Sequence, residues 1–106
     1  MIEITRQPDG IKVSGHAGYD EPGKDIVCAA VSTLTQAFIA AVDKLTADKI
    51  KCETGPGTAL IRYTGNLSRD AQLLEDSFFL GVKMIAEDYP QYVHIAQACT
   101  ALNCKD

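Results

Sequence analysis

The stretch that decides the fold is residues 25–47, DIVCAAVSTLTQAFIAAVDKLTA. Its apolar residues recur at the spacing of one helical face, and alanines fill many positions between them. We therefore predict a helix over about residues 26–47. Asp25 is a plausible N-cap, because a carboxylate there accepts the unpaired backbone N–H groups of the first turn. The apolar stripe comprises Val27, Val31, Leu34, Phe38, Ala41, Val42 and Leu45.

The segments on either side of this helix alternate in the manner of β-strands. Before it, alternating apolar residues flank the turn residues Pro8-Asp9-Gly10 and predict a hairpin. After it, residues 49–53 and 58–64 predict a second hairpin around Gly55-Pro56-Gly57. The alternating apolar residues of the first hairpin are Ile2, Ile4, Ile11 and Val13.

A second helix is predicted over residues 69–88, with Ser68 as its N-cap and Tyr89-Pro90 at its end. An optional last strand follows over residues 92–96. The order ββαββα(β) predicts an α+β fold, a two-layer sandwich whose antiparallel sheet of four to five strands is covered by two helices. The stripe of the second helix comprises Leu74, Phe78, Val82 and Ile85, and Phe79 and Leu80 widen it.

Length and charge narrow the functional classes. The chain of 106 residues fits one small domain, 1–106, whose last residues, 97–106, form a tail with little pattern. The net charge of −4, with no basic run, argues against nucleic-acid binding. Polar residues interrupt the apolar stretches and the start lacks a signal-peptide pattern, so we expect no membrane association and a cytoplasmic location. The wide apolar arcs predict a homodimer.

His16 and Cys28 form the most informative pair of residues for chemistry. Cys28 falls at about the third position of the predicted helix, where the helix dipole favours an anion such as a thiolate. Strand alternation directs His16 away from the core, unless Gly15 bends the strand. A thiolate and an imidazole together suit nucleophilic and acid–base catalysis. Spacing alone leaves the plainer alternative open, in which Cys28 is a small apolar residue and His16 a solvated one.

Three neighbours of this pair have candidate accessory roles. The backbone amides of Cys28 and Ala29 could stabilise an oxyanion. Ser32, one turn after Cys28, could hydrogen-bond near the thiol or bond back to its own helix. Asp25 could orient His16 or only cap the helix, and the two roles compete for the same oxygens.

The loop between the pair is a candidate lid. Gly18, Pro22 and Gly23 permit hinge motion, and Tyr19 could contact the substrate. The alternative is a plain strand-to-helix connection.

The other cysteines carry weaker signals. Cys52 fits packing in a strand, and Cys99 and Cys104 lie near the C-terminus close to His94. No C-x-x-C pair or H-x-E arrangement occurs, so we expect no metal site. Without a secretory signal, the four cysteines are expected to be free thiols.

The motif Gly15-His16-Ala17, followed by residues 23–32, GKDIVCAAVS, resembles the signature of a known protease family. The family is the ribosomal-processing cysteine protease family Prp, whose pattern is Gly-His-Ala, a short loop, then Gly-x-Asp-x-Val-Cys-Ala-Ala-x-Ser. The resemblance extends over about residues 1–96, and every fixed position is filled.

This resemblance implies a cytoplasmic, homodimeric endopeptidase that removes a short N-terminal extension from a large-subunit ribosomal protein. It implies His16 as the base, Cys28 as the nucleophile, and Asp25 and Ser32 in accessory positions. The loop between the pair is then mobile and ordered by the substrate. An apolar groove is expected beside the pair, because the family's substrates carry apolar and aromatic residues before the cut. No metal or organic cofactor is implied.

Three alternatives remain open from the sequence. Members of the family occur in phage genomes, where a capsid-related precursor could be the substrate. A non-catalytic module that binds such a precursor would use the same apolar surfaces. A redox sensor would pair Cys28 with another thiol.

Overall fold

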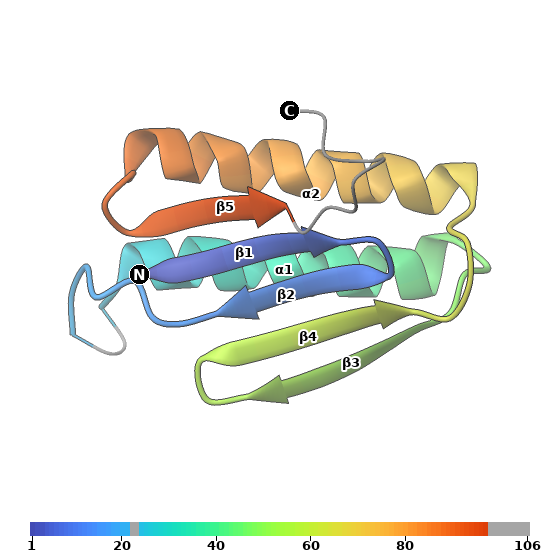
Figure 1. The fold of residues 1–106 in the computed structure, drawn as a ribbon, viewed down its shortest axis with the longest axis horizontal. Helices are drawn as coiled ribbons and strands as arrows, with labels where there is room; N and C mark the ends of the chain where they lie inside the picture. The colour runs from blue at the N-terminus through green and yellow to red at the C-terminus, as the bar shows by residue number, and fades with distance from the viewer. Residues whose placement is uncertain (22–23, 98–106) are drawn as a thin grey trace.

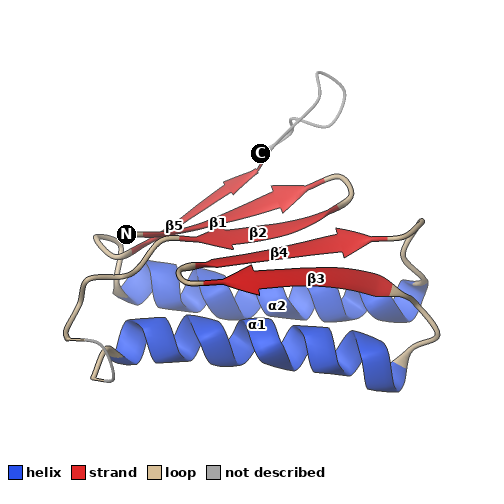
Figure 2. Cartoon of the chain, turned by 90° about the horizontal axis from the view of Figure 1, so that it is seen from below, coloured by secondary structure: helices blue, strands red, loops and turns tan. Residues whose placement is uncertain are grey.

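The computed structural model describes residues 1–21 and 24–97, which form a sheet resting on two helices (Figure 1). Both helices cover the same face of the sheet (Figure 2). The predicted two-layer α+β class is therefore confirmed. In chain order the elements are β1 (Ile2–Gln7), β2 (Gly10–Ser14), α1 (Ile26–Leu45), β3 (Ile50–Gly55), β4 (Thr58–Tyr63), α2 (Arg69–Asp88) and β5 (Val93–Gln97).

The sheet is mixed rather than wholly antiparallel. Its strand order is β3-β4-β2-β1-β5, and the two hairpins are antiparallel as predicted. However, β5 pairs in parallel with β1, in a register that places Ile2 opposite Val93. The prediction was wrong at this pair because it extended the hairpin pattern to the last strand. A helix the length of α2 instead carries the chain back along the sheet, as parallel connections require.

The predicted helices are confirmed with small changes at their ends. α1 ends at Leu45, two residues earlier than predicted, and the Thr46 hydroxyl donates a hydrogen bond to the Val42 carbonyl at 2.7 Å. α2 has the predicted bounds, and the Ser68 hydroxyl accepts the Ala71 N–H at 3.2 Å.

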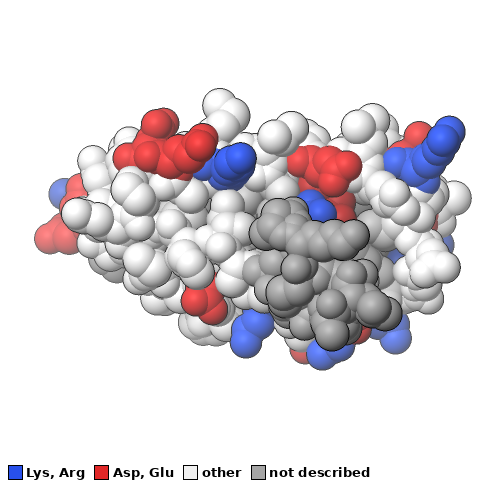
Figure 3. All heavy atoms as spheres, turned by 45° about the horizontal axis from the view of Figure 1, so that its top comes forward, with Lys and Arg blue, Asp and Glu red and all other residues white. Residues whose placement is uncertain are grey.

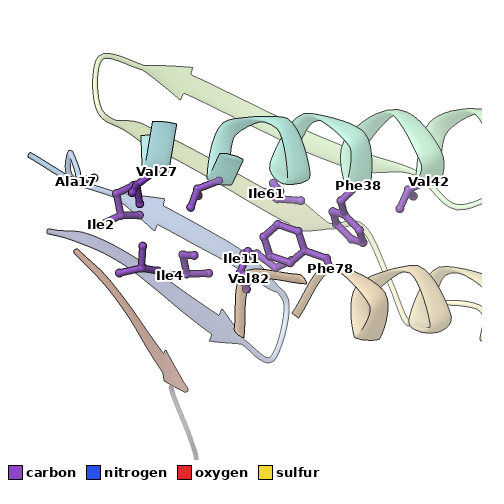
Figure 4. Close-up of a cluster of buried hydrophobic side chains, with 12 residues drawn as sticks. Ile2, Ile4, Ile11, Ala17, Val27, Phe38, Val42, Ile61, Phe78 and Val82 are labelled. Carbon is purple, nitrogen blue, oxygen red and sulfur yellow. The ribbon is translucent and has the colours of Figure 1, made fainter. Parts of the chain in front are cut away.

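The core lies between the sheet and the helices (Figure 4). The rings of Phe38 from α1 and Phe78 from α2 meet there with centroids 5.5 Å apart. Strand alternation supplies the opposite wall, since every second residue faces the helices. The strand residues in this cluster are Ile2, Ile4, Ile11, Ile61 and Val93.

By length and composition alone, α1 would qualify as a membrane span. The expectation that no segment could do so was therefore too strict. The apolar stripe of α1 nevertheless packs in the core, where Val27, Val31, Phe38 and Val42 are buried. α1 is thus buried along one stripe, as a helix packed on a sheet is.

Candidate active site

The end of β2, the start of α1 and the β3–β4 turn meet at one end of the sheet (Figure 1). The Gly15 N–H donates to the Gly57 carbonyl at 2.7 Å. Gly15 has φ +92°, and a Cβ built on it would lie 2.3 Å from the Met1 carbonyl oxygen. Only glycine fits such a position without strain. The chain therefore bends here, and His16, just after the bend, is exposed as the sequence predicted.

This bend brings His16 and Cys28 to one cavity. The cavity has a volume of about 290 Å³ and is lined by both side chains. The other lining residues come from the sheet, the β3–β4 turn and α1, and they are mixed in character. The apolar ones are Ile2, Val13, Val31, Ile39 and Ala59, and the polar ones are Ser32, Thr35, Gln36, Thr54 and Thr58. The structure thus places the predicted pair beside one cavity with both apolar and polar walls.

The Cys28 thiol is half-buried at the third position of α1. The Ala17 N–H group donates a hydrogen bond to its Sγ atom at 3.3 Å. The residue after His16 in the Gly-His-Ala motif therefore contacts the sulfur directly through its backbone.

Asp25 is the predicted N-cap of α1, and both its carboxylate oxygens are in use. Oδ1 accepts the N–H groups of Val27 and Cys28 at 3.0 and 2.9 Å. Oδ2 accepts those of Tyr19 and Asp20 at 3.0 and 3.4 Å. These donors, the Cys28 N–H above all, hold the pKa of the carboxyl below its ordinary value, against the opposing effect of burial. The capping role is confirmed.

The amides predicted to bind an oxyanion already have partners. The Cys28 N–H bonds to Asp25 Oδ1, and the Ala29 N–H bonds to the Asp25 carbonyl oxygen at 3.0 Å. Both bonds belong to the capped first turn of the helix. Neither N–H group is therefore available to donate a hydrogen bond to an oxyanion beside the thiol.

A second cavity, of about 540 Å³, lies on the loop side of the pair. Ser32 lines both cavities, as His16 and Cys28 do. The residues that line only the loop-side cavity are Gly18, Asp20, Asp25 and Ala29.

Tyr19, the predicted substrate contact of the loop, packs on two aromatic residues and stays 40% exposed. Its ring packs edge-on against Tyr89 and Tyr92, with centroid distances of 5.5 and 5.2 Å. It contributes to the lining of neither cavity. Tyr19 instead attaches the loop to the junction between α2 and β5. The predicted loop residues Pro22 and Gly23 lie outside the described residues.

Sequence reasoning missed the contact between His16 and the β3–β4 turn. Gly57 has φ +70°, and a Cβ built on it would lie 2.7 Å from His16 Nε2. The available signal was the Gly55-Pro56-Gly57 turn, but nothing local connects that turn to His16.

Cys52 lines neither of the two cavities beside Cys28. Cys52 is an exposed free thiol on β3, and partial burial of its sulfur raises its pKa. Cys99 and Cys104 lie outside the described residues. Within residues 1–21 and 24–97, no three His, Cys, Asp or Glu side chains come together as a metal site.

Comparison with known proteins shows which family the chain belongs to. The family model described as cysteine protease Prp matches residues 1–94. The chain belongs to the Prp cysteine protease family.

Curated Prp relatives cover nearly the whole chain. It is 27% identical over 100 residues to the ribosomal processing cysteine protease Prp of Staphylococcus aureus, covering 89% of this chain and 94% of that protein. It is 31% identical over 97 residues to the Prp of Mycoplasma genitalium, covering 90% and 94%.

A solved Prp structure has the same fold. The S. aureus Prp crystallised with a covalently linked product peptide superposes with a TM-score of 0.89. The match covers 92% of this chain and 100% of that chain at 24% identity. The Prp-family fold is therefore preserved at low sequence identity.

Proposed function

We propose that this Prp-family chain is an endopeptidase in which Cys28 is the nucleophile and His16 transfers the protons. The observation that carries the proposal is the cavity that both side chains line at the start of α1. The Ala17 N–H lies directly beside the nucleophilic atom, as a donor to Sγ at 3.3 Å. The positive end of the helix dipole acts on the same atom.

The chemistry proceeds in two halves. His16 accepts the thiol proton, and the sulfur bonds to the substrate carbonyl carbon. His16 then protonates the leaving amine, so that the C–N bond breaks and a thioester remains on Cys28. His16 next takes a proton from water, whose oxygen attacks the thioester. Return of that proton to the sulfur breaks the C–S bond and releases the free thiol and a carboxylic acid, which loses its own proton to solvent.

We assign the oxyanion donor to Ala17 rather than to Ala29. The Ala29 N–H is bonded to the Asp25 carbonyl at 3.0 Å, and its release would disrupt the first turn of α1. The Ala17 N–H already lies beside the sulfur that forms the new bond. Ser32 lines both cavities and is placed to contact the substrate or the attacking water.

The proposed substrate is a large-subunit ribosomal protein with a short N-terminal extension. Relatives in S. aureus and M. genitalium are named ribosomal processing proteases, and S. aureus Prp has been crystallised with a substrate peptide. We place the residues before the cut in the 290 Å³ cavity, because the apolar part of its lining suits an apolar stretch. The residues after the cut then lie in the loop-side cavity.

The test is to incubate the purified protein with the extended ribosomal protein of the same cell and to sequence any new N-terminus. We expect one cut, which Cys28→Ala and His16→Ala abolish while folding is retained. Cys28→Ser should be nearly inactive, because this setting does not appreciably ionise a serine hydroxyl. Processing by Cys28→Ala at the wild-type rate would overturn the proposal.

We propose a homodimer formed through the outer face of α2. This face exposes Leu73, Leu80 and Met84, at 69%, 65% and 65% of their surface, on one helical stripe. Analytical ultracentrifugation should show a dimer for the wild type and a monomer for Leu80→Glu. Leu45→Glu is the matched control, because Leu45 is 71% exposed at the end of α1. A wild-type monomer at working concentration would refute this interface.

We place the enzyme in the cytoplasm, where ribosomal proteins are made and thiols stay reduced. Figure 3 shows Lys and Arg as separate groups beside acidic clusters on the face that it displays. This distribution and the net charge of −4 support a basic protein as the partner rather than a nucleic acid.

A further inference from the structure

The candidate active site continues into a third cavity further along α1. That cavity has a volume of about 330 Å³. It shares Gln36 and Ile39 with the cavity of His16 and Cys28, so the two cavities are neighbours along α1, and together we call them the groove. Ile39, Ala40 and Ile50 supply an apolar floor, and Asp43 and Lys44 belong to its charged rim. We call this third cavity the distal cavity.

The face of α1 that carries Cys28 leads directly to the distal cavity. Residues 28, 32, 36, 39 and 43 recur at helical spacing and therefore share one side of the helix. From Cys28 the helix rises about 16 Å to Ile39 and about 22 Å to Asp43, at about 1.5 Å per residue. An extended peptide covers these lengths in about five and seven residues, at about 3.3 Å per residue.

The opposite wall of the groove suits an extended chain. β3 is the edge strand of the sheet and lies beside α1 (Figure 2). Its outer edge pairs with no other strand of residues 1–21 and 24–97, so backbone groups are available there for a peptide. Cys52 and Ile50 face the distal cavity from this strand.

We propose that apolar substrate residues about five to seven positions before the cut occupy the distal cavity. The substrate segment lies extended along α1 and β3, and the distal cavity selects for the length and apolar character of the extension. This inference rests on the proposed peptidase function, because the positions are counted from the Cys28 thiol.

The first experiment compares two peptides copied from the extended ribosomal protein, with four and with eight residues before the cut. We expect kcat/KM to be at least about tenfold higher for the longer peptide, since burial of one apolar side chain supplies that much. Replacing its apolar residues at positions five to seven with Asp should remove most of the gain. Equal kcat/KM for both peptides would overturn the inference.

A variant pair locates the effect on the protein. Ala40→Phe fills the distal cavity. In this variant the kcat/KM of the longer peptide, divided by that of the shorter one, should fall to about one. Ala37→Phe is the matched control, because Ala37 is also exposed on α1 but lines neither cavity of the groove. It should keep the wild-type ratio. Equal ratios in both variants would contradict the assignment.

A disulfide experiment tests occupancy without any cleavage. Gly57, in the β3–β4 turn, lies against His16, whereas Cys52 lies on β3 in the lining of the distal cavity. In the Cys28→Ala variant, a peptide with cysteine five residues before the cut should form a disulfide with Cys52 under mild oxidation. The same peptide with cysteine two residues before the cut should form much less.

Mass spectrometry identifies the protein cysteine in each product. Equal yields from both peptides, or no disulfide at Cys52, would count against the distal cavity as the binding site. If neither substrate peptide is cleaved by the wild type, the proposed function is what fails, and the disulfide yield still decides the question of the cavity.

Discussion

The imidazole of His16 lies against the backbone of Gly57, so closely that a Cβ built on Gly57 would approach Nε2 to 2.7 Å. The β3–β4 turn thus forms a wall behind the proposed general base. A side chain on Gly57 has to push the imidazole away, because the three atoms nearest to the added Cβ all belong to that ring.

Gly57→Ala should therefore lower kcat about tenfold or more, since small misplacements of a reacting group have effects of this size. It should also lower the free energy of unfolding by about 1–2 kcal/mol, because φ +70° is unfavourable for alanine. Gly18→Ala is the control for the backbone effect, with φ +69° and nothing within 4 Å of the added Cβ. The NMR chemical shifts of the His16 ring should differ from the wild type in Gly57→Ala and match it in Gly18→Ala. Changes of the same size in both variants would contradict the contact.

Asp25 should have its main effect on stability and loop order. Asp25→Ala removes the acceptor of four backbone N–H groups and should lower Tm by about 5 °C or more. Asp25→Ser keeps an N-cap acceptor, so it should recover most of the Tm while residues 19–20 exchange amide protons faster. Hydrogen exchange measures the second effect. Loss of activity in Asp25→Ser with an unchanged loop would instead favour a role in orienting His16.

The pH dependence of stability follows from the lowered pKa of Asp25. The ionised carboxylate is favoured in the folded state, so its contribution is fully present above the unfolded pKa of about 4. It is lost as the pH falls through the lower folded value. Denaturant titrations between pH 7 and pH 2 should show a smaller acid loss in Asp25→Ala than in the wild type. Parallel curves would contradict this assignment.

Tyr19 should hold the loop through its ring rather than its hydroxyl. Tyr19→Ala removes two edge-on contacts, each worth about 0.5–1.5 kcal/mol, and should increase proteolytic cleavage in the loop. Tyr19→Phe should behave like the wild type, because the ring packing is kept. Limited proteolysis followed by mass spectrometry compares the three proteins, and equal sensitivity of Phe and Ala variants would exclude a packing role.

Tyr63 marks a polar cluster that serves stability and not the site. Its hydroxyl donates to the Glu75 carboxylate, which also pairs with Arg6 at 3.8 Å. Burial and this bond raise the pKa of Tyr63. Tyr63→Phe should lower the free energy of unfolding by about 1 kcal/mol, with peptidase activity unchanged. Tyr92→Phe, whose hydroxyl forms no hydrogen bond with residues 1–21 or 24–97, should be neutral in denaturant titrations.

The dependence of the free energy of unfolding on alkaline pH tests the same hydrogen bond between Tyr63 and Glu75. Because the folded pKa of Tyr63 is raised, the wild type should lose stability as the pH rises above the unfolded value of about 10. Tyr63→Phe should show a shallower loss over the same range. An identical slope in both proteins would mean that the hydroxyl does not titrate with folding.

The sequence predicted the helices well because their patterns are local. The stripes around Phe38 and Phe78 and the caps Asp25 and Ser68 placed both helices within two residues of their observed ends. The cap also placed Cys28 at the third helical position. The cavity beside Cys28 has both apolar and polar walls, whereas the family resemblance implied an apolar groove.

The features that escaped prediction depend on contacts between distant segments. The parallel pairing of β5 with β1, the contact of Gly57 with His16 and the packing of Tyr19 on Tyr89 have no local signal. Alternation predicted an exposed His16, and His16 is exposed, but alternation carries no information on the close approach of Met1 that demands glycine at position 15.

The two carboxylate oxygens of Asp25 accept hydrogen bonds from two different segments near Cys28. Oδ2 holds only the loop, through Tyr19 and Asp20, while Oδ1 holds only the first turn of α1. Loss of the Oδ2 bonds to Tyr19 and Asp20 would therefore leave the Oδ1 bonds to the first turn in place. A single carboxylate thus serves two segments of the chain through separate atoms.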